Sequence, residues 1–343
     1  MKQQNETIRP RALLAGVHLN ENNDFEVSMK ELHNLVKACD MDPVVRVDQN
    51  LSCINAAYYI GSGKVGEIRE AVETLYVDYV IFNDTLSPSQ LKNLQREIDV
   101  PVWDRTYLIL EIFSRRARTK EAKMQVESAR LQYMLPRLMG LRDSLGRQGG
   151  ASGSLSNKGS GEKQIELDRR KIEGRISELR RELERMEQER EVQRRKRTQG
   201  TYPQAALVGY TNAGKSTLLN KLVELSSGKE EKMVMAKDML FATLDTTVRK
   251  ISLSGSQDFL LSDTVGFISR LPHSLVKAFR STLDEIRYAD LLLHVVDFSD
   301  EHYKEQIEVT EETLKELGAG DIPRIYIMNK ADSVMEEETL PKI

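Results

Sequence analysis

A glycine-rich stretch with one lysine and one serine stands out in the second half of the chain. It reads Gly209-Tyr-Thr-Asn-Ala-Gly214-Lys215-Ser216, and it lies between the apolar run 205–208 and a helical pattern at 216–225. Glycines at this spacing let backbone N–H groups wrap the phosphates of a nucleotide, while Lys215 reaches the β- and γ-oxygens and Ser216 ligates Mg²⁺. The stretch therefore predicts a P-loop that binds a nucleoside triphosphate.

A second element follows at the end of another apolar run. In Leu260-Leu-Ser-Asp263-Thr-Val-Gly266 the carboxylate lies 47 residues after Ser216. We expect Asp263 to hold the Mg²⁺ ion through a water molecule and the Gly266 amide to meet the γ-phosphate. Asp263 and Gly266 thus supply the next two groups that phosphoryl transfer requires.

A third element selects the base. Asn329-Lys330-Ala331-Asp332 follows the apolar run 324–328. The carboxylate of Asp332 can accept hydrogen bonds from both N1–H and the exocyclic amine of guanine, a pair of donors that adenine lacks. The sequence therefore predicts GTP as the nucleotide.

A switch loop is expected between the first two elements, within Phe241-Ala-Thr243-Leu-Asp245-Thr-Thr-Val-Arg249. It must bring a threonine hydroxyl to Mg²⁺ and the γ-phosphate. We choose Thr243, although Thr246 and Thr247 compete with it on spacing alone.

The predicted site combines catalytic residues, metal ligands and nucleotide contacts from these four elements. Its expected catalytic residues are Lys215, Thr243 and Gly266, and its expected metal ligands are Ser216, Thr243 and Asp263. The expected GTP contacts are Gly209, Tyr210, Thr211, Asn212, Ala213, Gly214, Lys215, Ser216, Thr217, Phe241, Ala242, Thr243, Leu244, Asp245, Asp263, Thr264, Val265, Gly266, Asn329, Lys330, Ala331 and Asp332.

Two positions bear on the rate of hydrolysis. A Ras-like enzyme places a glutamine after the glycine of the second element to orient the attacking water, whereas this chain has Phe267. We therefore expect slow intrinsic hydrolysis until a partner completes the site, unless another residue substitutes in cis. Asn212 resembles the position used by potassium-activated GTPases, so we expect K⁺ to support hydrolysis better than Na⁺.

The elements that must position these residues fall into three parts: an α/β domain at 1–112, a helical hairpin at 113–200 and a G domain at 201–343. In the first part, helical patterns at 29–39, 65–74 and 87–98 alternate with apolar runs, which favours a parallel sheet. The expected strands are Ala12–Val17, Val44–Val47, Ala57–Ile60, Tyr79–Phe82 and Val100–Trp103. The G domain is expected to hold a parallel sheet with flanking helices.

The middle part predicts two antiparallel helices joined by a Gly/Ser-rich tip at 146–161. The first helix runs from about Tyr107 to Leu145, with Pro136 kinking or interrupting it. The second carries an a/d seam of apolar residues among charged ones. The seam residues are Ile165, Ile172, Ile176, Leu179, Leu183 and Met186.

Charge is distributed unevenly along the 343 residues. The whole chain has 50 Lys and Arg against 53 Asp and Glu, but residues 113–200 have 23 against 13, a net charge of +10. Such a segment attracts RNA, although an Arg-rich solvated helix would have the same composition. No apolar run approaches the length of a membrane span, the N-terminus lacks a signal region, and the two cysteines fit a reducing cytosol. We expect a cytoplasmic monomer.

With these residues in view, the chain resembles the HflX family of translational GTPases. Beyond the shared GTPase motifs, the resemblance rests on Tyr59-Ile-Gly-Ser-Gly-Lys-Val65, Ile81-Phe-Asn-Asp84, Leu86-Ser-Pro-Ser-Gln90, Arg147-Gln-Gly-Gly150, Gly161-Glu162, Asp168-Arg-Arg170, Phe241-Ala-Thr-Leu-Asp245 and Asp263-Thr-Val-Gly-Phe-Ile-Ser-Arg-Leu-Pro-His273. It implies a GTPase that binds the large (50S) ribosomal subunit and its RNA, and that splits or rescues stalled ribosomes or matures the subunit. It also implies that Thr243 is the Mg²⁺ ligand and that the tip of the hairpin approaches the peptidyl transferase region.

The chain departs from the family pattern in two places. Its tip ends in Gly159-Ser-Gly-Glu162 instead of Gly-Pro-Gly-Glu, and no Ser-Ala-Lys element follows Asp332. We therefore expect the G domain to be truncated at its C-terminus and to bind GTP more weakly than a longer version.

A second glycine pattern, Gly61-Ser-Gly63-Lys-Val-Gly66, fits the dinucleotide spacing, with Asp84 near the position of the acidic partner. We favour a structural turn, while the resemblance leaves open a site for ATP in this region.

Three functions remain open from the sequence. The leading one is a GTPase stimulated by the ribosome, and the alternative is a nucleotide-gated RNA- or ribosome-binding module with negligible turnover. The third is a GTPase that acts on another structured RNA or on a protein complex bound by the coiled-coil seam.

Overall fold

The computed structural model describes residues 9–19, 24–147, 155–198, 202–227, 240–241, 244, 246–253, 255, 257–272, 275 and 279–334. The chain divides into two compact units, residues 1–115 with 127–180 and residues 116–126 with 181–343. We describe each unit by itself and call them the N-terminal unit and the G unit. Both contain a sheet flanked by helices, as the sequence predicts.

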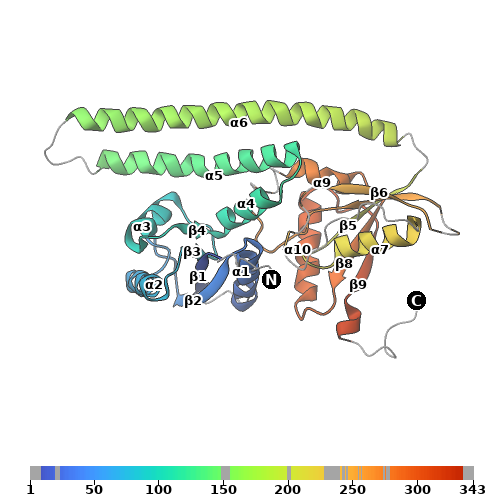
Figure 1. The fold of residues 1–343 in the computed structure, drawn as a ribbon, viewed down its shortest axis with the longest axis horizontal. Helices are drawn as coiled ribbons and strands as arrows, with labels where there is room; N and C mark the ends of the chain where they lie inside the picture. The colour runs from blue at the N-terminus through green and yellow to red at the C-terminus, as the bar shows by residue number, and fades with distance from the viewer. Residues whose placement is uncertain are drawn as a thin grey trace, which may run out of the picture. The chain divides into compact units, whose positions relative to one another are not determined.

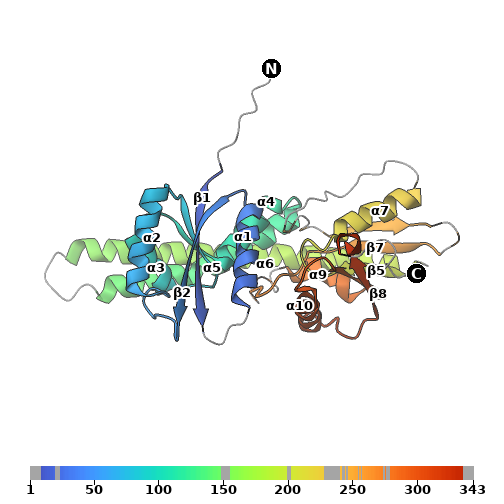
Figure 2. The ribbon, with the colours of Figure 1, turned by 90° about the horizontal axis from the view of Figure 1, so that it is seen from below.

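The N-terminal unit is built on a parallel sheet with the strand order β2-β1-β3-β4. Its strands are β1 (Arg11–Leu19), β2 (Asp42–Leu51), β3 (Tyr79–Phe82) and β4 (Val102–Asp104). Helices α2 (Ser62–Leu75) and α3 (Pro88–Ile98) lie on one face of the sheet, and α1 (Phe25–Ala38) lies on the other (Figures 1 and 2). Alternate residues of β1 explain this, since Leu13 and Ala15 join the core under α2 and α3, while Gly16 faces Met29 of α1.

The prediction of a strand at Ala57–Ile60 is wrong. The side chain of Asn55 accepts hydrogen bonds from the backbone N–H groups of Ala57 (2.8 Å) and Tyr58 (3.0 Å). These donors are therefore used by a local turn and are not available to a sheet. The turn leads directly into α2.

The long helix predicted from Tyr107 is divided, but not at Pro136. Helix α4 (Arg105–Arg116) ends before Ala117, and α5 (Lys120–Arg147) begins after Thr119, whose hydroxyl accepts from the N–H of Ala122 at 3.1 Å. This hydroxyl caps the new helix at its first turn. Pro136 lies inside the 28 residues of α5, so the expected interruption at that position is wrong.

Helix α6 (Leu155–Thr198) pairs with α5 in antiparallel orientation. Glu127 of α5 pairs with Arg175 of α6 at 2.7 Å, and Lys120 pairs with Glu182 at 3.3 Å. Residue numbers therefore increase in opposite directions along the two helices. On the apolar seam, Ile176 and Leu179 are buried and Ile172, Leu183 and Met186 are partly buried. The side chain of Ile165 lies outside the described residues.

The predicted tip at 146–161 is partly helical. Residues 146–147 end α5 and residues 155–161 begin α6, while 148–154 lie outside the described residues. A glycine inside a helix costs only about 1 kcal/mol, and a helix of 44 residues tolerates that cost at Gly159 and Gly161.

The G unit contains a five-stranded sheet with the order β6-β7-β5-β8-β9. Its strands are β5 (Gln204–Val208), β6 (Thr247–Ile251), β7 (Phe259–Asp263), β8 (Leu291–Asp297) and β9 (Arg324–Asn329). Its helices include α7 (Lys215–Ser227), α9 (Arg280–Arg287) and α10 (Tyr303–Glu316), and α7 packs over Leu207 and Val295.

One strand of this sheet differs from the expected parallel arrangement. β6 pairs with β7 in antiparallel orientation, and it uses residues that we assigned to the switch loop. The β-branched residues Thr247, Val248 and Ile251 favour such an edge strand. In the described part of the chain, no helix is both long enough and apolar enough to span a membrane.

Candidate GTP-binding site

The predicted P-loop connects β5 to α7 at the carboxyl end of the sheet. Gly209 has φ of +140° and Gly214 has φ of +96°, a region that only glycine adopts readily. A Cβ atom would lie 2.2 Å from the carbonyl oxygen of Val295 at Gly209 and 2.1 Å from Nδ2 of Asn329 at Gly214. Both glycines are thus required by conformation and by space, and the loop leads into the N-terminus of a helix, where anions bind favourably.

Lys215 is the buried cation of this loop. Its Nζ donates hydrogen bonds to the carbonyl oxygens of Gly209 (3.0 Å) and Tyr210 (2.7 Å). Burial lowers the pKa of Lys215 to about 8, while the Asp263 carboxylate opposes this shift. The loop therefore holds the ammonium group in position without neutralising it, as a phosphate-binding lysine requires.

Ser216 and Asp263 meet next to Lys215. The Ser216 hydroxyl donates to Oδ2 of Asp263 at 2.6 Å, and Asp263 is fully buried at the end of β7, the strand next to β5. A hydroxyl and a carboxylate are hard oxygen ligands of the kind that Mg²⁺ prefers. The residues present therefore fit the Mg²⁺ ion that accompanies GTP.

The segment after Asp263 packs directly against the P-loop. Thr211 N–H donates to Phe267 O at 2.7 Å, and Phe267 N–H donates to Gly209 O at 3.2 Å. A Cβ atom at Gly266 would lie 2.6 Å from Cα of Thr211 and 3.0 Å from Nζ of Lys215, so glycine is required by this contact. The structure thus brings Gly266 beside Lys215, the other residue that we expect to meet the γ-phosphate.

Phe267 is only 1% exposed. Its ring is part of the core and cannot contact a water molecule in front of a phosphate. This burial agrees with the interpretation that the position does not orient the attacking water.

The segment that we expect to contact guanine is hydrogen-bonded to the P-loop. Asn329, at the end of β9, donates from Nδ2 to the carbonyl oxygen of Ala213 at 2.8 Å. Lys330 has φ of +58°, and its Nζ pairs with Oδ2 of Asp297 at 2.7 Å. Asp332 follows on the short 3₁₀ turn η1 (Ala331–Ser333), where its side chain is exposed.

The remaining predicted contacts divide into three groups. Tyr210, Asn212 and the exposed Thr217 belong to the same loop and helix start. The side chains of Thr211, Ala213, Phe241, Leu244, Thr264 and Val265 are buried, so they shape the site from within. Ala242, Thr243 and Asp245 lie outside the described residues, and the choice of Thr243 over Thr246 therefore stays a prediction; Thr247, its other competitor, begins β6.

Two of the buried threonines fasten neighbouring segments together. The Thr211 hydroxyl accepts from the N–H of Phe241 at 2.9 Å, and the Thr264 hydroxyl donates to Leu207 O at 2.6 Å. One bond joins the P-loop to the predicted switch segment, and the other joins β5 to the segment that contains Gly266.

Sequence reasoning missed Asp297. It ends β8 beside Asn329 at the end of β9, and its carboxylate holds Lys330. A signal was present, since an acidic residue follows the apolar run 291–296 at the carboxyl end of a predicted strand.

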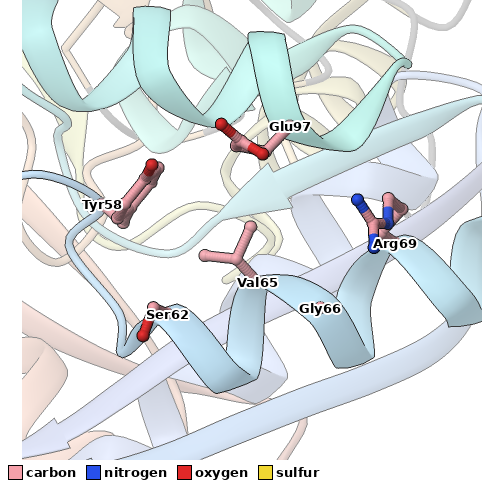
Figure 3. A pocket seen from close by; sticks show the side chains of 6 residues that line it. All are labelled: Tyr58, Ser62, Val65, Gly66, Arg69 and Glu97. Atoms are coloured by element: carbon pink, nitrogen blue, oxygen red, sulfur yellow. The ribbon is translucent and has the colours of Figure 1, made fainter.

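The second glycine pattern has a different geometry. Gly61 precedes α2 with an ordinary φ of −67°, while Gly63 and Gly66 lie within the helix, where an added Cβ would meet nothing within 4 Å. A cavity of about 210 Å³ lies beside this helix. Figure 3 shows the residues that line it, which are Tyr58, Ser62, Val65, Gly66, Arg69 and Glu97.

Comparisons with known proteins agree with this geometry over most of the chain. Residues 26–114 match a family described as GTP-binding GTPase N-terminal, residues 116–197 match GTP-binding GTPase Middle Region, and residues 204–330 match 50S ribosome-binding GTPase. A GTPase HflX from Lacrimispora saccharolytica is 47% identical over 326 residues, which cover 95% of this chain and 75% of the relative. This chain belongs to the HflX family of GTPases.

Other relatives support the assignment. GTPase HflX from Escherichia coli is 42% identical, over 97% of this chain and 75% of its own length. The solved GDP complex of a protein called SsGBP superposes with a TM-score of 0.52 at 26% identity, covering 95% of this chain and 84% of that one. A GTP-binding protein of Sulfolobus solfataricus in complex with GDP gives a TM-score of 0.50 at 27% identity and covers the same shares of the two chains.

Family and site together establish the activity class. This HflX-family member is a P-loop GTPase, and the predictions of GTP binding and of an α/β fold with a GTPase domain are confirmed.

Proposed function

We propose that this HflX-family GTPase binds the large (50S) ribosomal subunit, splits or rescues stalled ribosomes or matures the subunit, and hydrolyses GTP rapidly only when the ribosome stimulates it. The observation that carries the proposal is the site formed by Lys215, Ser216 and Asp263 within a region that matches a 50S ribosome-binding GTPase family. The net charge of +10 on residues 113–200 supports a partner rich in phosphate.

The residues of the site divide the work of hydrolysis among them. Lys215 binds the β- and γ-phosphate oxygens, the Gly266 amide faces the γ-phosphate, and Asp332 accepts from the guanine edge. Ser216 and Asp263, with Thr243, would hold Mg²⁺, which neutralises charge on the phosphates when it is bound. The buried ring of Phe267 cannot orient the attacking water. That step therefore belongs to the ribosome-bound state.

A module with negligible turnover is the second candidate function. The burial of Phe267 favours it, because the usual water-orienting position is part of the core. In this reading the nucleotide only sets the affinity for the ribosome.

The test compares GTP turnover of the whole chain with and without purified large subunits. Stimulation of about a hundredfold or more, within the range that a completed site supplies, supports the first function. A turnover unchanged by subunits supports the second. Co-sedimentation with large subunits, in the presence of a non-hydrolysable GTP analogue at moderate salt, is expected under both, and its absence would contradict the ribosomal partner.

The contribution of the basic helix has its own test. R194Q/R197Q removes two positive charges from the end of α6, and K304Q/K315Q removes two exposed charges from α10. The first variant should bind subunits more weakly and with a flatter salt dependence, while the second should behave like the wild type.

Two cofactor questions belong to the same proposal. If Asn212 supports K⁺ binding, GTP hydrolysis should be faster in K⁺ than in Na⁺. Equal rates would contradict a potassium requirement. We do not include a second site for ATP at the start of α2, because its glycines do not form a loop that wraps phosphates and the nearby cavity contains Glu97 as well as Arg69.

A further inference from the structure

The N-terminal unit contains a second cavity, of about 310 Å³, that the GTPase motifs do not use. It lies among α3, β4, α4 and α5, which Figure 1 shows grouped together. Its wall combines aromatic rings, aliphatic side chains and two cations. We call it the aromatic pocket and define it by Leu91, Lys92, Trp103, Tyr107, Tyr133 and Arg137.

The rings of the pocket belong to a continuous series. Ring centroids are 4.7 Å apart between Tyr79 and Trp103, 5.0 Å between Trp103 and Tyr107, and 5.6 Å between Tyr107 and Tyr133. The series runs from β3 through β4 and α4 to α5. Trp103, Tyr107 and Tyr133 are each partly exposed, so solvent reaches these rings in the part of the chain that the structure describes.

Two arginines fix the rings in place. The guanidinium carbon of Arg137 lies 3.3 Å from the centroid of Tyr133, and that of Arg130 lies 5.4 Å from the centroid of Tyr107. Arg130 also donates to the Tyr107 hydroxyl at 2.7 Å. The rings therefore have defined positions before any ligand arrives, which lowers the entropic cost of binding.

A buried carboxylate anchors this arrangement. Asp104 is fully buried and accepts from Nη2 of Arg137 at 3.0 Å, from the N–H of Tyr107 at 2.8 Å and from the N–H of Leu86 at 3.1 Å. Asp104 thereby joins the segment before α3, the start of α4 and the middle of α5. Four elements hold one rigid pocket.

The chemistry of the wall indicates the ligand. Aromatic rings backed by arginines bind flat π-systems, and nearby cations favour a ligand that carries phosphate. The volume is at the low end of the range for small-molecule pockets, which suits one planar group and excludes a helix. The pocket also belongs to the unit that contains residues 113–115 and 127–180, which have 12 Lys and Arg against 7 Asp and Glu, a net charge of +5.

We propose that the aromatic pocket binds a single unpaired nucleobase of an RNA, stacked on Trp103, whose ring meets Tyr107 at an interplanar angle of 65°, with Lys92 beside its phosphate. This inference rests on the proposed function, since it assumes an RNA partner. It adds a specific contact that neither the GTP site nor the net charge of the hairpin supplies.

Trp103 is the only tryptophan of the chain, so its fluorescence reports on the pocket directly. In the whole chain with GTP analogue bound, a short single-stranded RNA should quench this fluorescence. An RNA of equal length and charge with abasic sites should not. Equal quenching by both, or by neither, would overturn the proposal.

A variant pair measures the contribution of stacking. Trp103→Leu should weaken binding of the labelled RNA about tenfold, as loss of one stacked base does, while the abasic RNA should bind both proteins equally. Trp103→Phe keeps a ring and should retain most of the affinity. Tyr76→Leu removes an 81% exposed ring outside the pocket and should have no effect.

Two further outcomes distinguish the pocket proposal from the ribosomal function and from a protein-docking site. If the wild type co-sediments with large subunits while Trp103→Leu binds RNA as the wild type does, the pocket proposal fails and the ribosomal function stands. If a proline-rich peptide quenches Trp103 and RNA does not, the pocket is a protein-docking site and the proposal is wrong. Unfolding curves of Trp103→Leu and Trp103→Phe should coincide, which shows that affinity and not folding has changed.

Discussion

Two glycine and lysine turns in this chain look similar in sequence and differ in structure. Around Gly214-Lys215, the glycines have positive φ, an added Cβ would clash, and the lysine is buried on two carbonyl oxygens. Around Gly63-Lys64, the glycines lie in a regular helix with open space, and Lys64 pairs with Glu67 at 2.5 Å. Phosphate binding therefore depends on the backbone conformation that glycine permits, and not on glycine spacing alone.

The largest expected effect separates the two lysines. Lys215→Ala should weaken GTP binding about a hundredfold or more, because it removes charged hydrogen bonds to two phosphates. Lys64→Ala should leave GTP affinity unchanged. Titration calorimetry measures both, and a loss of affinity in Lys64→Ala would show that the two turns are functionally linked.

Alanine substitutions of the glycines should likewise weaken GTP binding at Gly214 and leave it unaffected at Gly63. Gly214→Ala places a Cβ at φ of +96° against Asn329, and we expect GTP affinity to fall about thirtyfold from the combined strain and displacement. Gly63→Ala should instead stabilise α2 by up to about 1 kcal/mol, because alanine is the better helix former. Fluorescent GTP binding and urea unfolding test the pair. A Gly214→Ala protein with normal affinity would show that the loop does not need its observed conformation.

The turn that we expect to contact guanine has no counterpart near Gly63, and a substitution there should have a smaller effect on GTP affinity. Asp332→Asn should lower GTP affinity about tenfold, since one charge-assisted acceptor is lost, and should reduce the preference for GTP over ITP, which lacks the exocyclic amine. Ser333→Ala, on the same turn, is the matched control and should bind as the wild type does. An unchanged GTP/ITP ratio in Asp332→Asn would remove the guanine-reading role.

The residues that support the two segments also differ, since only one of them can bind a proton between pH 4 and 7. Gly61 N–H is held by the neutral amide of Gln49 at 2.8 Å, whereas Val208, before Gly209, pairs across the sheet with His294. His294 is 1% exposed, and its burial lowers its pKa to about 4, despite the Glu311 carboxylate 3.5 Å from Nδ1.

The sign of the resulting pH effect follows from this shift. Between pH 4 and 6.5 the unfolded chain binds a proton at His294 that the folded chain does not, so stability rises with pH in this window and is lost as pH falls. From pH 7 to 5.5 the loss at this residue is about 1 kcal/mol. Urea unfolding at both pH values should show a loss smaller by that amount in His294→Asn than in the wild type. Identical pH dependence in the two proteins would show that His294 is not buried in its neutral form.

Much of the site could be predicted because it depends on local spacing. Lys215 and Ser216 occupy fixed positions in one loop, and Asp263 and Asn329 end apolar runs whose carboxyl ends meet at one sheet edge. Contacts between distant segments could not be predicted this way, and so the pairing of Asp297 with Lys330, the hydrogen bond from Asn329 to Ala213 and the burial of Phe267 required the structure. Ala57–Ile60 misled the strand prediction because a side chain, Asn55, took over its backbone donors.

By itself the sequence determined the order of the motifs, the family, the parallel sheet of the N-terminal unit, and the net charge of +10 on the segment 113–200. The tertiary structure decided which glycines adopt positive φ, that the long helix breaks at Thr119 and not at Pro136, and that Trp103, Tyr107 and Tyr133 share one pocket. The reason is physical. Motif spacing and periodicity are set by neighbours along the chain, whereas backbone strain, burial and ring contacts are set by residues that only folding brings together.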